Sequence, residues 1–503
     1  MNATPNNGAP GVRRFPPGFV WGAATSAYQI EGAVDEDGRG SSVWDTFSHM
    51  PGKVQRGDTG DIACDSYHRA EEDFELLDEL GLGAYRFSIA WPRIQPTGRG
   101  PVNQPGLDYY RSLIEGLRAR GIAPVATVHH WDLPQALADR GGWASRETAG
   151  RFAEYAALLA EALGDQVAMW ITVNEPKQVA HQGYRVGTHA PGKTDFALAA
   201  AATHHLLLGH GLAVAAMRSA LPGRVPIGIS LDIHPIRAAD EDALEAAAAV
   251  DAEQNRIFLE PVLHGSYPEA ARAELLPPAE LIEPSDMETI HAPIDFLGLN
   301  YSTPHYVRRG DWDDLRLGES PLPGHPGVVD FVPPELPCTV MGWVVEPDGL
   351  YDTLCALDRE APRLPIDITE NGCAADDYVS PQGDVNDRER IAYLEGHLDA
   401  AWRAIQDGVN LSGYFHWSLM DNFEWACGYQ RRFGLYFVDF ETQRRLPKRS
   451  AAFYSKVTQT NELPAGGGIT AARHAVRGRV RSAPGQFARP GASVQGRPTP
   501  AQR

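Results

Sequence analysis

Short apolar runs alternate with amphipathic segments along most of the chain. In residues 65–81 the apolar side chains recur at the spacing of one helix face. Asp65 or Ser66 stands where a residue could cap the start of this helix, and Gly81 follows its last apolar residue. The apolar run 84–91 comes next and has the composition of a strand. The pattern therefore predicts a helix followed at once by a strand.

Eight apolar runs have the length and composition of buried strands. They are residues 19–24, 84–91, 122–131, 167–175, 225–234, 295–302, 364–371 and 411–419. Helical segments separate them, as residues 387–408 do before the last run. Continuous apolar strands that alternate with helices are typical of a parallel sheet covered on both faces. Eight of them predict a single (β/α)₈ TIM barrel, with long βα loops after the fourth, fifth and sixth strands.

Polar or aromatic residues stand toward the C-terminal end of most of these runs. They are Arg86, His130, Asn174, Glu175, Asn300, Glu370 and Trp417. For any one of them, a strand that simply meets solvent is an equally good explanation. In a (β/α)₈ barrel, however, the C-terminal ends of the strands form the floor of the active site. We therefore expect these side chains to converge.

Two carboxylates, Glu175 and Glu370, each end a β-branched apolar run. We expect Pro176 to hold Glu175 in extended backbone and Gly372 to allow a tight turn after Glu370. Paired carboxylates across a barrel end suit glycoside hydrolysis, which needs one protonated and one ionised group. A nearby negative charge would raise the pKa of the acid, and a cation such as Arg86 would lower that of the nucleophile.

Aromatic side chains lie beside these polar groups. Trp131, Trp417 and Trp425 offer flat rings next to hydrogen-bonding residues. A sugar presents apolar C–H faces with hydroxyl groups around the rim, so the combination suits a carbohydrate. A single tryptophan would more often belong to the core.

Composition limits the other functional classes. The 503-residue chain carries a net charge of −20, although residues 465–503 contain seven arginines and no Asp, Glu or Lys. An acidic body repels phosphate backbones, and the basic tail lacks interleaved aromatic residues, so nucleic-acid binding is not expected. The five scattered cysteines form no CxxC pair, and no apolar leader or 18-residue apolar stretch is present. We expect a cytoplasmic protein without membrane contact.

The ends of the chain differ in composition from the predicted barrel. We expect residues 1–14 to be a flexible N-terminal segment and residues 15–460 to be the (β/α)₈ glycoside hydrolase domain. Residues 461–503 are rich in Gly, Pro and Arg, which is typical of a disordered basic tail.

The motifs at the strand ends resemble those of glycoside hydrolase family 1, the retaining β-glucosidases and related β-glycosidases. The resemblance covers about residues 15–457. The motifs, in the family's order, are "FPPGFVWGAATSAYQIEGA", "YRFSIAWPRI", "HHWDLP", "TVNEP", "ITENG" and "SLMDNFEWACGYQRRFGLYFVDF". The resemblance implies a single barrel that needs no cofactor or metal and acts on small β-glucosides or oligosaccharides.

Roles follow from the resemblance residue by residue. It implies that Glu175 is the acid/base, that Glu370 is the nucleophile and that Arg86 is the cation beside it. The residues implied in holding the sugar are Gln29, His130, Asn174, Glu424 and Trp425, with Trp417 as a platform and Trp343 on the aglycone side. The implied reaction is double displacement, with the two carboxyl groups about 5–5.5 Å apart.

The substrate that the resemblance implies is a terminal, non-reducing β-D-glucosyl residue of a cello-oligosaccharide or of an aryl or alkyl β-glucoside, which fits a role in cellulose degradation. Glu175 argues against a thioglucosidase, and Glu424 argues against 6-phosphosugars. The choice among glucoside, galactoside and fucoside stays open, as do the natural aglycone, transglycosylation and the oligomeric state.

Ser302 departs from the family pattern, which has Asn-Tyr-Tyr where this chain has Asn300, Tyr301 and Ser302. The second tyrosine of the family hydrogen-bonds the nucleophile. Tyr301 cannot replace it, because alternate side chains on a strand face opposite ways. We expect a hydrolase with an altered or reduced rate.

Two alternatives remain at this point. A catalytically impaired sugar-binding protein with the same fold would explain Ser302. A metal-dependent hydrolase would use His129, His130 and Asp132, yet these residues lack the i, i+4 histidine pair of a helical zinc site. His204, His205 and His210 more often belong to a packed helix in such a pattern.

Overall fold

The eight apolar runs form a closed barrel of parallel strands in this computed structural model, which describes residues 12–464 except 222, 272–275, 312, 314, 316–318 and 324. The strands, in order around the barrel, are β12 (Ile366–Asn371), β13 (Leu411–Trp417), β2 (Val20–Ala24), β3 (Ala84–Ser88), β4 (Ala123–His129), β5 (Met169–Asn174), β6 (Ile227–Asp232) and β8 (Phe296–Tyr301). The predicted TIM barrel is confirmed.

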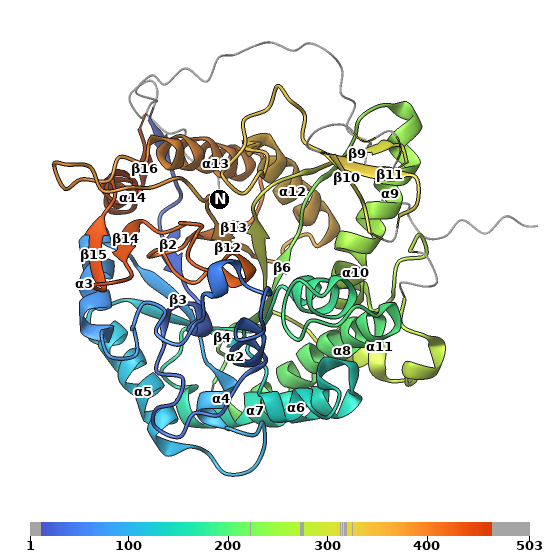
Figure 1. The fold of residues 1–503 in the computed structure, drawn as a ribbon, viewed down its shortest axis with the longest axis horizontal. Helices are drawn as coiled ribbons and strands as arrows, with labels where there is room; N and C mark the ends of the chain where they lie inside the picture. The colour runs from blue at the N-terminus through green and yellow to red at the C-terminus, as the bar shows by residue number, and fades with distance from the viewer. Residues whose placement is uncertain are drawn as a thin grey trace, which may run out of the picture.

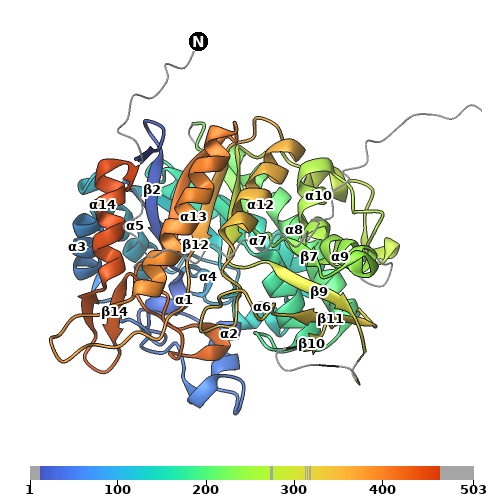
Figure 2. The ribbon, with the colours of Figure 1, turned by 90° about the horizontal axis from the view of Figure 1, so that it is seen from above.

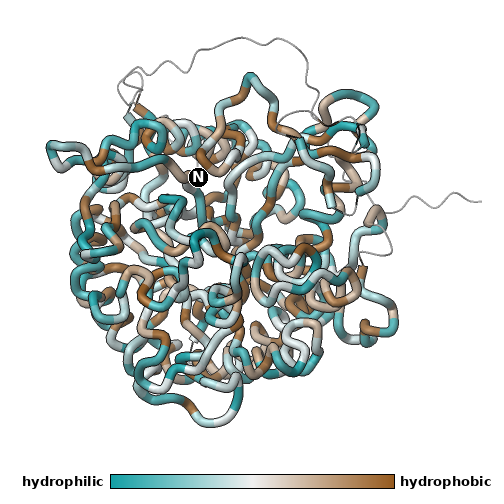
Figure 3. Tube along the Cα trace, in the orientation of Figure 1, coloured by the Kyte–Doolittle hydropathy of each residue, from teal (hydrophilic) through white to brown (hydrophobic). Residues whose placement is uncertain are grey.

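Helices surround the barrel, with the strands at the centre of Figure 1 and α12, α13 and α14 along one side of it in Figure 2. The longer helices are α3 (Ala70–Leu80), α5 (Gln104–Ala119), α7 (Arg146–Leu163), α8 (Phe196–Ala220), α9 (Leu244–Asp251), α10 (Ile257–His264), α12 (Pro347–Glu360), α13 (Arg388–Gln406) and α14 (Arg449–Thr460). The shorter ones are α1 (Ala27–Ile30), α2 (Val43–Ser48), α4 (Trp91–Ile94), α6 (Gln135–Ala138) and α11 (Asp286–Ile290). Hydrophobic and hydrophilic residues alternate along the outer helices in Figure 3, as expected for helices with one buried face.

The first predicted helix starts later than the apolar spacing indicates. Helix α3 begins at Ala70, not at residues 65 or 66, because Asp65 has φ +53° and residues 65–69 form turns. The Asp65 carboxylate pairs with His68 and Arg69 instead of capping a helix. The C-terminal end is as predicted, since Gly81 adopts φ +65°.

The long loops predicted after the fifth and sixth barrel strands together carry a small sheet outside the barrel. Its strands are β10 (Glu319–Pro321), β11 (Val328–Phe331), β9 (His305–Arg309) and β7 (Ile236–Ala238), in that order. Val307 and Val328 of this sheet pack against Ala246 and Val250 of α9. A hairpin of β14 (Tyr436–Asp439) and β15 (Arg444–Pro447) follows the last barrel strand.

The two ends of the described chain pair with each other. Strand β1 (Arg13–Arg14) is antiparallel to β16 (Glu462–Leu463). These residues fall in segments that we predicted to be flexible or disordered, so the domain boundaries at 14/15 and 460/461 are wrong by a few residues. The rest of both segments lies outside the described residues.

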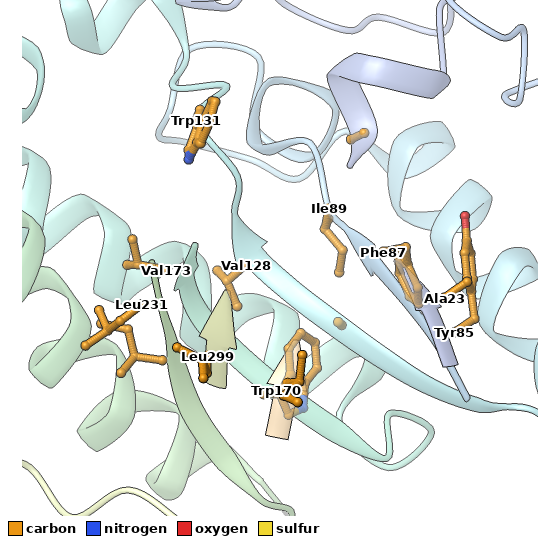
Figure 4. Close-up of a cluster of buried hydrophobic side chains, with 14 of the residues drawn as sticks. Ala23, Tyr85, Phe87, Ile89, Val128, Trp131, Trp170, Val173, Leu231 and Leu299 are labelled. Carbon is orange, nitrogen blue, oxygen red and sulfur yellow. The ribbon is translucent and has the colours of Figure 1, made fainter. Parts of the chain in front are cut away.

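The core has an inner and an outer layer. The inner layer fills the barrel and includes Ala84, Val125, Ile171, Phe296 and Phe415. The outer layer lies between strands and helices, and Figure 4 shows part of it, with Val128, Trp170, Val173, Leu231 and Leu299 on neighbouring strands. Helix α8 is long and apolar enough to cross a membrane, but 83% of its most apolar window is buried inside the protein. It is therefore a core helix of this fold.

Candidate active site

Glu175 stands directly after β5 at the C-terminal end of the barrel. Its amide donates a hydrogen bond to the Ser230 carbonyl on β6 (2.9 Å), which fixes the backbone where the strand ends. Glu175 has φ +47°, so the prediction of an extended backbone before Pro176 is wrong. This left-handed conformation is uncommon for a non-glycine residue and is often found at functional sites.

Glu370 lies on β12 and is buried beside Arg86 of β3. One guanidinium nitrogen of Arg86 donates both to the Glu370 carboxylate and to the Thr369 carbonyl (2.9 Å). The other donates to Asn174 Oδ1 (2.6 Å), so Arg86 ties the nucleophile candidate to β5. Gly372 does not have the positive φ of a tight turn, contrary to the prediction. Glycine is needed there because a Cβ would lie 1.8 Å from the Trp417 carbonyl oxygen.

Asn300 of β8 joins the two halves of the site. Its amide nitrogen donates to Glu175 Oε1 (2.7 Å) and to Asn174 Oδ1 (3.0 Å). Its oxygen accepts hydrogen bonds from the hydroxyls of Ser230 and Thr369. The orientation of the Asn300 amide is therefore fixed by its neighbours on both sides.

Tyr301 points away from the carboxylates, as strand alternation predicts. The Tyr301 hydroxyl donates to the Glu346 carbonyl (2.8 Å), and its ring lies against His397 of α13, away from the carboxylates. Ser302 is half-buried just beyond the end of β8, and its carbonyl accepts a hydrogen bond from Tyr393. Tyr301 therefore does not replace the missing tyrosine.

The two carboxyl groups have different electrostatic surroundings. Burial raises the pKa of Glu175 well above its usual value, and the charges of Asp232 and Glu370 raise it further. Burial also raises the pKa of Glu370, but the Arg86 guanidinium and the Asn300 amide oppose that effect. Arg86 thus acts in the predicted direction. Glu175 keeps its proton to higher pH than Glu370, which is the order that an acid and a nucleophile require.

The polar residues predicted to bind a sugar lie around these carboxylates. The Gln29 amide, on α1, donates to Asn422 Oδ1 (3.1 Å) and to the Phe423 carbonyl (2.8 Å), next to Glu424. Burial and the charge of Glu370 raise the pKa of Glu424 to about 8. His130 Nε2 lies 3.2 Å from the Asn174 amide, and burial lowers the pKa of His130 well below its usual value.

Aromatic rings form one side of the site. The ring of His130 is stacked with those of Trp417 and Trp425, at centroid distances of 5.9 and 6.0 Å. Trp131 lies 4.5 Å from Trp425 and donates a hydrogen bond to the Asn174 carbonyl. Trp343 packs against the cluster that contains Trp417. The structure therefore brings the two carboxylates together with Arg86, Asn174, Asn300, His130 and the tryptophans, and their roles toward a sugar stay predictions.

The histidines considered for a metal site have other partners. His129 lies against Trp143, whose indole nitrogen is 3.2 Å from its Nε2, on the opposite side of the strand from His130. In α8, His204 contacts Asp286, His205 contacts the Trp143 carbonyl and His210 contacts Thr172. The predicted role of these three histidines in a packed helix is confirmed.

Two charged residues that the sequence-based prediction does not include lie beside Glu175. Lys177 follows it by two positions, and Asp232 ends β6. Their side chains form an ion pair with 2.8 Å between Nζ and Oδ2, and both are buried. Asp232 could have been found, since it is also a polar residue at the end of a predicted strand. Nothing in the sequence pattern marks Lys177.

Comparison with known proteins identifies close relatives along almost the whole described chain. The family model "Glycosyl hydrolase family 1" matches residues 12–463. A 1,4-beta-D-glucan glucohydrolase of Thermotoga neapolitana is 46% identical, over 90% of this chain and 100% of its own length. A bifunctional beta-D-glucosidase/beta-D-fucosidase of Bifidobacterium breve is 46% identical, over 88% and 97%.

Solved structures show the same arrangement of the chain. The beta-glucosidase of Thermotoga maritima in complex with deoxynojirimycin superimposes with a TM-score of 0.83 at 46% identity. The alignment covers 90% of this chain and 99% of that one.

Proposed function

The chain belongs to glycosyl hydrolase family 1 and is a β-glucosidase, and we propose that it removes terminal, non-reducing β-D-glucosyl residues by double displacement. The observation that carries this proposal is the unequal environment of the two carboxyl groups. Glu370 has Arg86 against it, whereas the charges that act most strongly on Glu175 are those of Asp232 and Glu370. An ionised nucleophile and a protonated acid therefore coexist in one site.

In the first step Glu370 attacks the anomeric carbon while Glu175 gives its proton to the leaving oxygen. In the second step Glu175 takes a proton from water, which attacks the anomeric carbon and releases the sugar from Glu370 with retained configuration. Asn300 contributes by holding the Glu175 carboxyl, and Arg86 and Asn174 hold the Glu370 side of the site. The 5–5.5 Å separation expected for a retaining pair stays a prediction.

The surrounding residues support a neutral sugar as substrate. His130 Nδ1 and Glu424 Oε2 are buried atoms without a hydrogen-bond partner within the described chain, and a sugar hydroxyl could satisfy each of them. Trp417 and Trp425 offer ring faces to the C–H side of the sugar. A phosphate group would meet the Glu424 carboxyl, so 6-phosphosugars are disfavoured.

We propose cello-oligosaccharides and aryl or alkyl β-glucosides as substrates, with β-fucosidase or β-galactosidase side activity. The glucan glucohydrolase and the bifunctional glucosidase/fucosidase among the relatives support this range. A panel of 4-nitrophenyl β-glucoside, β-fucoside and β-galactoside together with cellobiose would rank these substrates by kcat/KM. If the glucoside and cellobiose were the poorest of the four, the proposed preference would be wrong.

The two carboxyl roles can be tested separately. Glu175→Gln should slow hydrolysis of phenyl β-glucoside by about 10²- to 10⁴-fold, because its leaving group needs a proton. The same variant should form the glycosyl-enzyme at a nearly normal rate from 2,4-dinitrophenyl β-glucoside, whose leaving group does not. Glu370→Gln should lose activity on both substrates. Pre-steady-state bursts measure the first step directly.

A mechanism-based label gives an independent check of the nucleophile. A 2-deoxy-2-fluoro-β-glucoside should become attached to Glu370, as peptide mass spectrometry would detect, and NMR of the first product should show the β-anomer. A label on another residue, or an α-anomer, would overturn the proposal. Turnover in the same assay excludes the alternative of a protein that only binds sugar.

A further inference from the structure

A buried ion pair of Lys177 and Asp232 lies beside the acid/base candidate. Lys177 Nζ is 2.8 Å from Asp232 Oδ2 and also donates to the Asp232 carbonyl (2.9 Å). The Gln178 amide donates to the same carboxylate oxygen (2.8 Å). The two charged side chains are only 6% and 4% exposed. Removing two charges from water is costly, and such a pair is weak as a device for stability alone.

The ion pair lies where β5 and β6 end, next to Glu175. Asp232 ends β6, and the carbonyl of Ser230 on that strand accepts the Glu175 amide hydrogen bond. In the register of β6 with β8, Asp232 stands opposite Asn300, which donates to the Glu175 carboxyl. Lys177 is two residues from Glu175 in the chain. Backbone pairing thus fixes Asp232 relative to the acid/base, and the ion pair holds the Lys177 side chain against Asp232.

We propose that Lys177 and Asp232 are positioning residues that set the pH range over which Glu175 keeps its proton. This proposal rests on the acid/base role proposed above for Glu175. Asp232 favours the protonated form of Glu175, and Lys177 favours the ionised form. Asp232 has the larger effect, so the pair as a whole keeps Glu175 protonated.

Asp232 remains charged in the working pH range. Although burial favours the neutral form, Lys177 and His234 hold the pKa of Asp232 below its usual value. Asp232 is therefore ionised wherever the enzyme would be active. Lys177 keeps Asp232 charged and at the same time limits its effect on Glu175.

Other charged or titratable side chains around Glu175 come from neighbouring barrel strands and loops. Across the site from Glu175 are the proposed nucleophile, Glu370 on β12, and its ion-pair partner, Arg86 on β3. The neighbouring histidines are His130 after β4, His181 on the segment after Glu175, and His234 after β6, with His305 of β9 packed behind His234. Burial lowers the pKa of His181 and His234 to about 4 and that of His130 well below its usual value, so these three are neutral near pH 7.

The test is the pH dependence of kcat/KM on phenyl β-glucoside, whose basic limb reports loss of the Glu175 proton in the free enzyme. Asp232→Asn should move that limb down by about one pH unit, because the charge that favours the protonated acid is gone. Lys177→Met should move it up. The double variant should lie between the two single variants.

Control variants separate tuning from simple structural support. Lys177→Arg keeps the charge and should leave the limb close to its wild-type position. Arg146→Met breaks another ion pair, with the buried Asp286 on α11, and should lower stability without moving the limb. If Asp232→Asn does not fold, Lys177→Met and Lys177→Arg still decide the question. A limb that stays fixed in Lys177→Met, or moves downward, overturns the proposal.

The same measurements distinguish a failure of this proposal from a failure of the acid/base role proposed for Glu175. If Glu175→Gln retains the wild-type basic limb, Glu175 is not the acid, and the proposed function fails. If Glu175→Gln abolishes the limb but the Lys177 and Asp232 variants leave it in place, only the role of the ion pair fails. With 2,4-dinitrophenyl β-glucoside, whose leaving group needs no proton, kcat/KM should lack this limb in the wild type and in all of these variants.

Discussion

Ser302 is the first residue after β8, two positions beyond Asn300. Among the described residues, Arg86 donates a side-chain hydrogen bond to the Glu370 carboxylate, and no tyrosine hydroxyl does so. Tyr301 is turned toward α13 and donates to a backbone carbonyl. Within the described chain, the nucleophile therefore lacks the tyrosine hydroxyl that a longer side chain at position 302 could supply.

Ser302→Tyr should raise kcat on an aryl β-glucoside. The new hydroxyl would reach the carboxylate, and one hydrogen bond to a charged group contributes about 1.5–3 kcal/mol, or about 10- to 100-fold in rate if it acts only in the transition state. Ser302→Phe supplies the same ring without the hydroxyl and is the matched control. A rate that stays the same or falls in Ser302→Tyr, or an equal gain in Ser302→Phe, would contradict this explanation.

The convergence of the side chains at the strand ends could be predicted from the sequence, because the geometry of a barrel alone brings those ends together. Arg86, Glu370 and Asn300 needed no knowledge of loops. What could not be predicted is how each group is held. The positive φ of Glu175 and the charge pair of Lys177 with Asp232 depend on contacts between β5 and β6 that no local pattern records.

At the scale of elements, β12 and β13 approach closely where the site is built. Gly372 follows the nucleophile strand, and its missing side chain leaves room for the Trp417 carbonyl of β13. Trp417 itself forms part of the aromatic side of the site. The spacing of these two strands therefore sets the distance between the nucleophile and the sugar platform.

Gly372→Ala should disturb this spacing. A Cβ would lie 1.8 Å from the Trp417 carbonyl oxygen, so backbone must move on one strand or the other. Because displacements of about 1 Å at a reaction site cost about 10²-fold, kcat/KM on 4-nitrophenyl β-glucoside should fall by that order, with a lower Tm. Wild-type activity in the variant would show that the strands can separate without effect.

Gly150→Ala is the control for this substitution. Gly150 lies in α7, is exposed, and has no atom within 4 Å of an added Cβ. Alanine there should stabilise the protein by about 0.5–1 kcal/mol and leave kcat/KM unchanged. The two variants together separate a close approach of strands from the general effect of replacing glycine.

The eight barrel strands could be predicted because each is an apolar run long enough to be recognised. The small sheet could not, because β7 and β10 have only three residues each and the sheet carries charged residues such as Arg308 and Glu319, which form an ion pair. Packing against α9 stabilises its strands, and their own sequences show no strand pattern. The late start of α3 has a similar origin, since turns at residues 65–69 replace the helix that the apolar spacing favours.

At the scale of the whole molecule, the two described ends of the chain contact each other and the first barrel strand. Strand β1 pairs with β16, and the Asn461 amide donates to the carbonyls of Phe15 and Pro16 (2.9 and 3.1 Å). Trp21 at the start of the first barrel strand donates to Asn461 Oδ1 (2.9 Å). Residues 461–463 therefore belong to the fold that holds the first strand in place.

Two truncations separate these residues from the basic tail. A chain that ends at Pro464 should keep wild-type kcat/KM and Tm, because the contacts of β16 and Asn461 remain. A chain that ends at Thr460 loses the Asn461 hydrogen bonds, at about 0.5–1.5 kcal/mol each, together with the β1–β16 pair. Its Tm should fall by several degrees, while kcat/KM below the transition changes little. Equal Tm values for the two chains would mean that the paired ends contribute nothing, and a loss of activity in the longer one would assign the tail a role in catalysis.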